Sequence, residues 1–188
     1  IIVADEVAPG SAEAIAELHK LGLATRLVSG DRKQVAEEIA QRMGIQHVVA
    51  EVLPEDKQRI VRELQSQKEV VAMVGDGIND APALAAADLG IAMGTGADVA
   101  LESADMVLTR HDLLLLPRAI RLSRNVLAVI RQNLWWALGY NVVLIPLAAG
   151  VLIPAFGISL PPALAAAAMA FSSVSVVLNS LRLRIVRI

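Results

Sequence analysis

Several residue types are missing from this chain as a whole or from long parts of it. Cysteine is absent from all 188 residues, so no disulfide and no thiolate metal site can form within them. No Asp, Glu, Lys or Arg occurs between Arg131 and Arg182. Acidic residues are absent after Asp112, where seven arginines give a charge of +7, whereas the part up to Asp112 holds all 19 acids and 10 of the 17 basic residues, a balance of −9. The two parts are therefore expected to lie in different surroundings.

The uncharged stretch is long enough for two membrane-spanning helices. A bilayer core requires about 20 apolar residues per helix, and we assign the spans to 134–153 and 163–181, joined by "PAFGISLPP". Hydrophobic residues make up 55% of the chain and the mean hydropathy is +0.57, which is typical of a partly embedded protein. The alternative, two buried helices of a soluble protein, conflicts with their length, since such helices rarely exceed about 14 uncharged residues.

Arginines predict the orientation of these spans. They flank the outer ends of both spans and are absent from the connection, so the positive-inside rule places both ends in the cytoplasm. We expect an integral protein of the lipid bilayer, in a bacterial plasma membrane. The chain opens on "IIVAD", which has the character of a strand and lacks an initiator Met, so we expect the C-terminal part of a longer protein.

Short β-rich runs alternate with helical patterns over residues 1–111. Helices are predicted over 11–22, with Ser11 as N-cap, over 33–43, from Pro54 to about Gln67, and briefly from Pro82. This alternation predicts an α/β fold, with a parallel sheet covered by helices on both faces. The basic, leucine-rich pattern of residues 112–133 predicts a linking helix that runs directly into the first span. The predicted strands are "IIVAD", "ATRLVS", "HVVAE", "VVAMVG", "LGIAM" and "ADMVL".

Two polar loops follow strands of this sheet, at the edge where ligands of open α/β sheets bind. Ser29, Gly30 and Asp31 follow "ATRLV" and offer a hydroxyl and backbone amides to an anion. In "GDGIND", which follows "VVAMV", Asp76 and Asp80 supply hard oxygen ligands suited to Mg²⁺.

A lysine lies between these loops in the sequence. Lys57, near the start of its helix, can place a point charge on a phosphoryl oxygen. Each feature alone has a plainer interpretation, as a turn, a helix cap or a solvated lysine. A hydroxyl, a lysine and paired acids in this order on successive strands are much more specific than any one of them.

The stretch "MVGDGINDAPALAAADLGIAMGTGADVALESADMVL" closely resembles the phosphorylation domain of P-type ATPases, which belong to the haloacid-dehalogenase-like superfamily. The resemblance implies a partial Rossmann-like sheet, and an aspartate elsewhere in the complete protein that is phosphorylated by ATP. The family's Thr-Gly-Asp loop is matched with Ser in place of Thr. By this resemblance the catalytic residues are Lys57, Asp76 and Asp80, the Mg²⁺ ligands are Asp76 and Asp80, and the phosphate-binding residues are Ser29, Gly30, Asp31, Lys57 and Asn79.

The spans contain polar and sulfur-bearing residues, which are costly in a membrane and usually functional. A thioether selects Cu(I) over Zn²⁺, and no carboxylate is present in the spans to favour a divalent ion. "NLWWALGYN" and "MAFSS" resemble the last two spans of copper-transporting P-type ATPases. That resemblance implies a Cu(I) transport site made of Tyr140, Asn141, Met169, Ser172 and Ser173.

Helix packing is the alternative for polar residues in spans. We prefer packing for Ser175, Asn179 and Ser180, and Pro146 is a candidate kink. A zinc- or cadmium-exporting relative is disfavoured by the lack of charge in the spans, whereas silver(I) cannot be separated from copper(I) by these residues.

Several family elements are missing from the sequence. It has no Asp-Lys-Thr-Gly-Thr motif, no nucleotide-binding domain and no Cys-Pro-Cys span, so this piece alone is not expected to hydrolyse ATP. The expected partners are the rest of the same protein, the transported metal ion, the bilayer and a cytosolic copper chaperone, and no nucleic acid. A non-catalytic, membrane-anchored module that binds Mg²⁺ or phosphate stays open as an alternative, whereas a soluble phosphatase conflicts with the spans.

Overall fold

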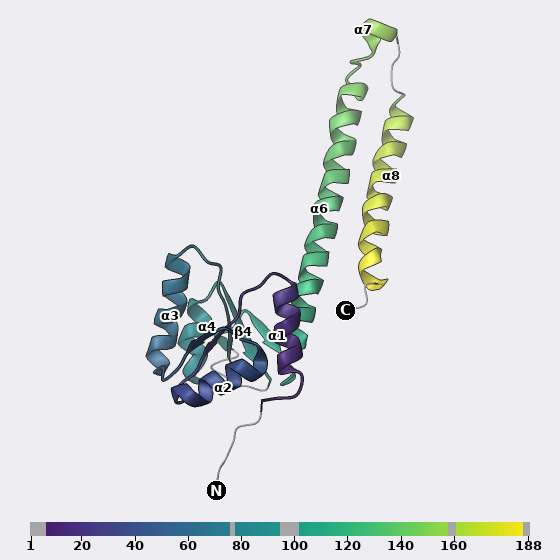
Figure 1. The fold of residues 1–188 in the computed structure, drawn as a ribbon. Helices are drawn as coiled ribbons and strands as arrows, with labels where there is room; N and C mark the ends of the chain where they lie inside the picture. The colour runs from purple at the N-terminus through teal and green to yellow at the C-terminus, as the bar shows by residue number, and fades with distance from the viewer. Residues whose placement is uncertain (1–6, 76–77, 95–101, 158–160, 186–188) are drawn as a thin grey trace. The chain divides into compact units, whose positions relative to one another are not determined.

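A computed structural model describes residues 7–75, 78–94, 102–157 and 161–185 (Figure 1). The chain divides into two compact units, residues 1–118 and 119–188. The first unit is an α/β unit and the second is a helical hairpin, and each is described by itself. The predicted strand "IIVAD" lies outside the described residues.

The α/β unit contains two parallel sheets. In the first sheet β1 (Arg26–Val28) pairs with β2 (His47–Val49), and in the second β4 (Leu89–Met93) lies between β3 (Ala72–Gly75) and β5 (Met106–Leu108). All pairs are parallel, as predicted. The expected single sheet is instead two sheets among the described residues, because nothing described there joins β1 to β3.

Helices alternate with these strands at the places where the sequence has start and stop signals. They are α1 (Ser11–Lys20), α2 (Lys33–Met43), α3 (Pro54–Ser66) and α4 (Ala81–Ala86), with a 3₁₀ turn, η1 (Ile78–Asp80), before α4. Gly44 ends α2 in the left-handed region (φ 76°), and Pro54 opens α3. The N-cap of α1 is Gly10 (φ 83°) and not Ser11, because Ser11 has already entered the helix.

The core of the α/β unit is built from small and branched apolar side chains. α4 packs against β3, β4 and α3, α2 packs against β2, and α1 packs against α2. Leu84 of α4 and Ile91 of β4 are fully buried. The close approach of α4 to β4 requires glycine at position 90, since a Cβ there would lie 2.6 Å from the Leu84 carbonyl oxygen.

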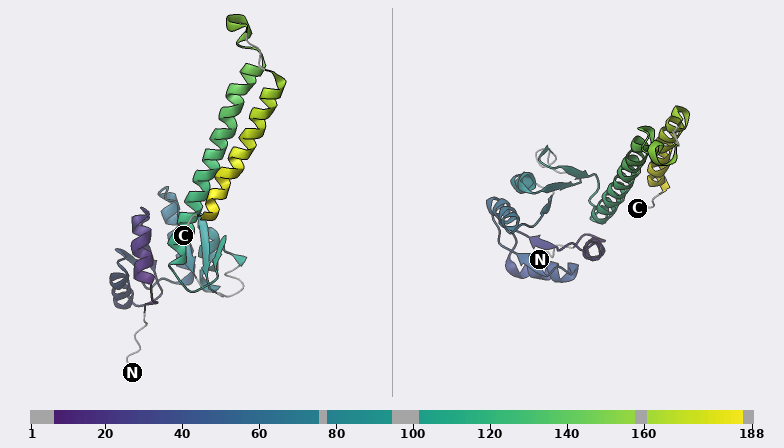
Figure 2. Two further views of the ribbon diagram at one scale, coloured as in Figure 1. Left: turned by 90° about the vertical axis from the view of Figure 1, so that its right-hand side faces the viewer. Right: turned by 90° about the horizontal axis from the view of Figure 1, so that it is seen from above.

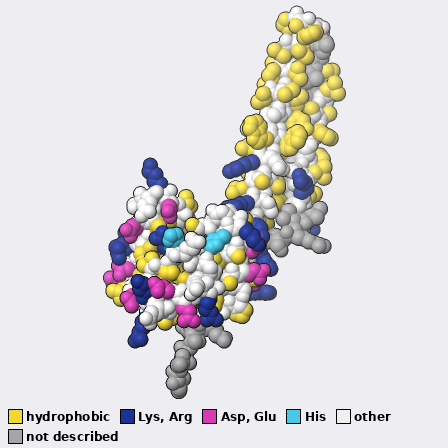
Figure 3. Space-filling view, viewed as in Figure 1, with side chains coloured by type: hydrophobic (Ala, Val, Ile, Leu, Met, Phe, Trp, Pro, Cys, Tyr) yellow, Lys and Arg dark blue, Asp and Glu magenta, His cyan; other side chains and the backbone are white. Residues whose placement is uncertain are grey.

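The second unit holds an antiparallel pair of helices, α8 (Pro162–Leu181) and the part of α6 (Leu115–Ala148) from residue 119 on, which lie side by side in all views (Figures 1 and 2). A short helix, α7 (Ile153–Phe156), lies in the connection, and a 3₁₀ turn, η2 (Arg182–Ile185), follows α8. Apolar side chains cover most of the visible surface of the hairpin (Figure 3), and Leu134, Val142, Ile145 and Leu178 are all more than half exposed.

The proposed first span differs from the structure at its end. α6 ends at Ala148, where we expected helix to Ile153. Pro146 has no backbone N–H to continue the helical bonding, and Gly150 turns the chain with φ 85°. By length and hydropathy, one helical stretch among the described residues, Ala166–Arg184, is suited to cross a membrane.

Candidate functional site

A short ion pair joins two of the predicted catalytic residues. Lys57 Nζ on α3 donates to Asp80 Oδ1 at 2.6 Å, although the two residues are 23 positions apart. Their side chains are only 18% and 11% exposed, so neither charge is well hydrated and each depends on the other. The pair fixes a positive charge beside the turn that follows β3.

Glycine at position 75 makes room for this pair. A Cβ added to Gly75, the last residue of β3, would lie 2.7 Å from the Asp80 Cβ and 2.8 Å from Asp80 Oδ2. Real Cβ atoms do not approach that closely, so the Asp80 carboxylate rests against the bare backbone of Gly75. From the sequence we predicted only that Gly75 permits a sharp turn, because the motif alone does not reveal this contact with Asp80.

The predicted anion loop follows β1 and is internally hydrogen-bonded. The Ser29 hydroxyl donates to Asp31 Oδ2 at 2.6 Å, and the Asp31 backbone N–H donates to Ser29 Oγ at 3.1 Å. The loop is held to the segment that follows β2, because the Val52 amide donates to the Ser29 carbonyl and the Glu51 amide donates to the Asp31 carbonyl. Gly30 is exposed, and a Cβ there would lie 3.3 Å from the Val52 carbonyl oxygen.

A groove of about 250 Å³ separates the two sheets. Its walls include Arg26 and Val28 of β1 and Ala72 and Met73 of β3, and Lys57 of α3 also lines it. Within the described part of the chain, β1 pairs only with β2, and β3 pairs only with β4. Each strand therefore turns one backbone edge toward the groove.

The remaining predicted residues of this site are placed less fully. Asn79 is exposed on η1, next to Asp80. Asp76 lies outside the described residues, so its place beside Asp80 stays a prediction. Among the residues that the structure describes, no group of three or more His, Cys, Asp or Glu gathers as a metal site, and Asp80 Oδ1 is occupied by Lys57.

The five predicted Cu(I)-site residues lie on facing helices, and no hydrogen bond found among the described residues joins those on α6 to those on α8. Tyr140 and Ser172 are half-buried in the seam between α6 and α8, whereas Asn141, Met169 and Ser173 are exposed. The Asn141 amide donates to the Ala137 carbonyl at 3.0 Å, and the Ser173 hydroxyl donates to the Met169 carbonyl at 3.3 Å. These bonds stay within one helix, so the polar atoms are tied to their own backbones.

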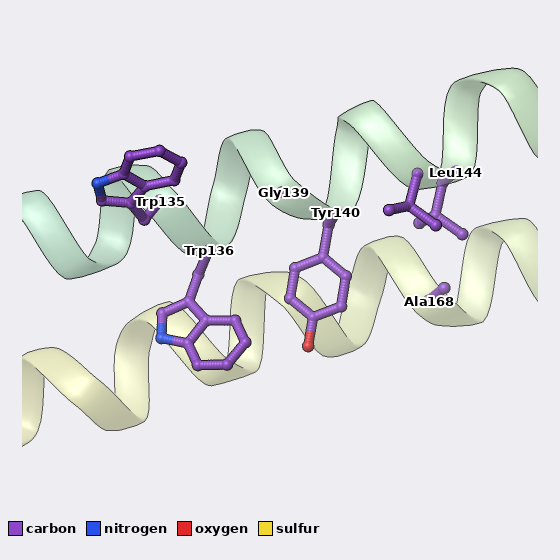
Figure 4. Close-up of a pocket in the computed structure, with 7 residues that line it drawn as sticks. Trp135, Trp136, Gly139, Tyr140, Leu144 and Ala168 are labelled. Carbon is purple, nitrogen blue, oxygen red and sulfur yellow. The ribbon is translucent and has the colours of Figure 1, made fainter.

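An apolar cavity lies on one flank of the hairpin (Figure 4), with a volume of about 580 Å³. Tyr140 points from α6 toward α8, and its ring lies 6.1 Å from that of Trp136, centroid to centroid. Helical periodicity puts Asn141, Met169 and Ser173 together on the opposite flank of the hairpin. The cavity is lined by Trp135, Trp136, Gly139, Tyr140, Val143, Leu144 and Ala168.

The helices of the hairpin are joined by amide side chains that sequence reasoning had largely overlooked. Asn133 Nδ2 donates to Ser180 Oγ at 2.8 Å, and Asn179 Nδ2 donates to Asn133 Oδ1 at 2.9 Å and to Gln132 Oε1 at 3.3 Å. We had assigned Asn179 and Ser180 to packing but had no role for Gln132 or Asn133. The sequence feature that could have indicated a role for Gln132 and Asn133 is their position directly after Arg131, where the uncharged stretch begins.

Comparison with known proteins places this site in a family. A family model described as haloacid dehalogenase-like hydrolase matches residues 1–88. The copper-exporting P-type ATPase of Legionella pneumophila is 53% identical over 98% of this chain and 25% of its own length. The chain belongs to the P-type ATPases. It spans about a quarter of the length of the curated relatives that it matches.

Other relatives carry different metals in their names. The silver exporting P-type ATPase of Salmonella typhimurium is 49% identical over the whole chain and 23% of its own length. A solved zinc-transporting PIB-type ATPase in its E2.Pi state has a TM-score of 0.82 and 42% identity over 95% of this chain and 28% of its own. The mixed α/β fold with parallel sheets is therefore that of this family.

Proposed function

We propose that the chain is part of an ATP-driven copper(I) export pump, in which an aspartyl phosphate forms and breaks down as Cu(I) leaves the cytoplasm. The observation that carries the proposal is the partly buried Lys57–Asp80 pair, 2.6 Å long, beside the turn that follows β3. A charge held in this way, before any substrate arrives, suits phosphoryl transfer, where catalysis is mostly positioning and charge stabilisation.

The loops around this pair supply the other contacts of the phosphoryl group. Negative charge spreads over the phosphoryl oxygens during transfer, and the Lys57 ammonium neutralises part of it. The Ser29 hydroxyl and the backbone amides after it donate hydrogen bonds, and Asn79 contacts the phosphate from the other loop. Mg²⁺, held by Asp76 and Asp80, supplies further positive charge when it is bound. The Ser29 hydroxyl, which donates to Asp31 Oδ2 in the structure, would donate to a phosphate oxygen instead when phosphate is bound.

The phosphorylated aspartate belongs to a segment outside this sequence, and the groove between the sheets is where we place that segment. The edges of β1 and β3 both face the groove. A further parallel strand there would pair with both and join the two sheets into one. Its carboxyl end would lie beside those of β1 and β3, which brings an aspartate at that end close to Ser29 and Lys57.

The hairpin supplies the transport site in this proposal, with α6 and α8 crossing the bilayer and their arginine-flanked ends in the cytoplasm. The Met169 sulfur is the soft ligand, and Tyr140, Asn141, Ser172 and Ser173 supply oxygen donors at a similar depth. Met169 is 60% exposed within the hairpin, so it is open to a ligand or to other parts of the complete protein. A cytosolic copper chaperone is the proposed donor of the metal.

Silver(I) is the second candidate cargo, because Ag(I) shares the soft chemistry of Cu(I) and the Salmonella relative is named for it. Zinc is disfavoured as cargo, since 132–181 contain no Asp or Glu to ligate a divalent ion, even though the solved zinc transporter has the same fold. A non-catalytic Mg²⁺- or phosphate-binding module would have little need for a buried lysine paired to its acid.

The test is the ATPase activity of the purified complete protein with Cu(I), Ag(I) or Zn²⁺ as the only transition metal. We expect Cu(I) and Ag(I) to stimulate ATP hydrolysis and the labelling of the protein by radioactive ATP, with Zn²⁺ much weaker. Stimulation by Zn²⁺ alone would refute the assigned cargo. No phosphoenzyme under any condition would refute the pump and favour the non-catalytic module.

A further inference from the structure

A cluster of neutral side chains fastens the two helices of the hairpin at the end marked by arginines. The cluster consists of Gln132, Asn133, Asn179 and Ser180, and we call it the amide clasp. Its bonds join residues 46 and 47 positions apart, and no other hydrogen bond between side chains of α6 and α8 is found among the described residues. Arg182 NH1 donates to Asn179 Oδ1 at 3.2 Å, which polarises that amide and strengthens its N–H bonds to α6.

The clasp sets the register of the seam. Because the helices run antiparallel, a residue a given number of positions after Asn133 on α6 lies level with the residue the same number of positions before Asn179 on α8. Seven residues along α6 lead from Asn133 to Tyr140, and seven residues back along α8 lead from Asn179 to Ser172. Seven residues are nearly two full turns and rise about 10 Å. Both side chains therefore also point from their own helix toward the other helix, as the side chains of the clasp do.

Two observations agree with this count. Tyr140 and Ser172 are both half-buried, as side chains in a seam should be. Eleven residues from the same bond lead to Leu144 on α6 and Ala168 on α8, and both line the cavity beside Tyr140 (Figure 4). The register at the clasp therefore persists through the level of the proposed transport site.

The transport-site residues cannot set this register themselves. The polar groups of Asn141 and Ser173 bond to carbonyls of their own helices, and among the described residues no hydrogen bond joins Tyr140 or Ser172 to the facing helix. Apolar contacts between helices in a bilayer give little preference for one register over another, since lipid is as apolar as the seam. A slip of one helical turn would move Ser172 about 5.4 Å away from the level of Tyr140.

We propose that Asn133 and Asn179 are positioning residues, which hold α6 and α8 in the register that brings Tyr140 and Asn141 level with Met169, Ser172 and Ser173. The functional part of this proposal rests on the copper(I) transport site proposed above. The clasp lies about two helical turns from that site and contacts no metal, so it acts through register alone.

The experiment uses the complete protein with Asn133→Ala, Asn179→Ala and both together. Ser175→Ala is the matched control, because the Ser175 hydroxyl lies on the same helix but bonds only to the Phe171 carbonyl of that helix. Register is read from the rate of disulfide formation between Leu144→Cys and Ala168→Cys without Cu(I), because this rate falls steeply as the two Cα atoms move apart. Mass spectrometry of the linked peptide separates this pair from cysteines elsewhere in the protein.

Function is read from two assays on the same variants. We expect the Cu(I) concentration for half-maximal ATPase activity to rise about three- to tenfold in each single variant, the range for hydrogen bonds between membrane helices. The double variant should lose little more than the single ones, because all remove one network. Phosphorylation by inorganic phosphate in the absence of Cu(I) should stay unchanged, and disulfide formation should fall several-fold. Ser175→Ala should match wild type in every assay.

The outcomes separate this proposal from the function on which it rests. Unchanged disulfide formation in the double variant would overturn the register role, and altered disulfide formation with an unchanged Cu(I) requirement would overturn the positioning role. Absence of Cu(I) stimulation in the wild-type protein would refute the proposed cargo, and the disulfide assay would still decide whether the clasp sets the register.

Discussion

In the α/β unit, polar groups from distant parts of the sequence meet, as the Lys57 ammonium and the Asp80 carboxylate do at 2.6 Å. In the hairpin, the polar groups of the proposed transport site bond to the backbone one turn away, as Asn141 does to Ala137. The hydrogen bonds between side chains of α6 and α8 are made by neutral amide and hydroxyl groups instead. A charge can be held in the first unit because a partner and partial hydration are available, whereas a charge in a bilayer would have neither.

This difference predicts that the largest effect comes from breaking the ion pair. We expect Lys57→Ala in the complete protein to lower phosphoenzyme formation by at least about 100-fold, the usual scale for losing one electrostatic contact to a transition state. It also leaves the Asp80 charge unpaired in a poorly hydrated place. Rapid-quench labelling with radioactive ATP measures the loss.

Lys33→Ala is the matched control for that substitution. Lys33 and Glu37 also form an ion pair, but at 3.8 Å and with side chains 73% and 54% exposed, so water replaces the contact. We expect wild-type labelling. Equal effects of the two substitutions would show that burial is not what makes the Lys57 pair important.

A smaller but still large effect is expected at Gly75. Gly75→Ala would place a methyl group 2.7 Å from the Asp80 Cβ, so the Asp80 carboxylate must move away from Lys57. We expect about a tenfold loss of phosphoenzyme formation, with unchanged half-maximal Cu(I), because the hairpin is untouched. Metal-dependent ATPase assays give both quantities.

Gly139→Ala tests the same change in the hairpin. An added Cβ there meets no described atom within 4 Å, so this hairpin by itself tolerates it. Wild-type activity is the expected result. A loss as large as that of Gly75→Ala would show that another segment of the complete protein packs closely on that face of α6.

The α/β unit was the easier of the two to predict. Pro54 and Gly44 mark helix ends by local backbone chemistry, and the limits of α2 and β4 agree with the sequence patterns. The division into two sheets was not predictable, because the strand patterns do not say which strands lie side by side. Nor was the contact of Gly75 with Asp80, since a glycine in a turn motif does not say what lies over it.

Two long apolar helices were predicted for the hairpin and are present as α6 and α8, but the end of the first and the pairing between them were not predicted. Hydropathy does not mark where α6 stops, since the apolar run continues through Pro146 and Gly150 to Ile153. The motif resemblance pointed to Tyr140 and Ser172, which share the seam, but periodicity alone could not pair the two helices. The hydrogen bonds of Asn133 with Asn179 and Ser180, which join the two helices, are visible only in the structure.

A smaller effect is expected at the proposed metal ligand. Met169→Leu keeps the volume and helix propensity of the side chain but removes the sulfur, so we expect half-maximal Cu(I) to rise about tenfold. Met106→Leu, in β5 of the α/β unit, is the matched control and should leave the Cu(I) requirement unchanged. Equal Cu(I) requirements in wild type and Met169→Leu would remove Met169 from the transport site.

The smallest effect concerns an acid of the α/β unit that has no counterpart in the hairpin. The Val71 amide donates to Asp88 Oδ2 at 2.8 Å, and this bond, together with one from Gln65, lowers the pKa of Asp88 below its usual value of 3.8. A lowered pKa means that the ionised form stabilises the fold above pH 3.8 and that this contribution is lost as pH falls through the folded-state pKa. Asp88→Asn should therefore lower the unfolding temperature of the complete protein by on the order of one or two degrees at pH 7. The difference from wild type should shrink as pH falls below 3.8 and through the lowered folded-state pKa, where the Asp88 carboxyl also becomes neutral. If the difference in unfolding temperature between wild type and Asp88→Asn were the same at pH 7 and at a pH well below 3.8, the carboxylate would act by its shape and not by its charge.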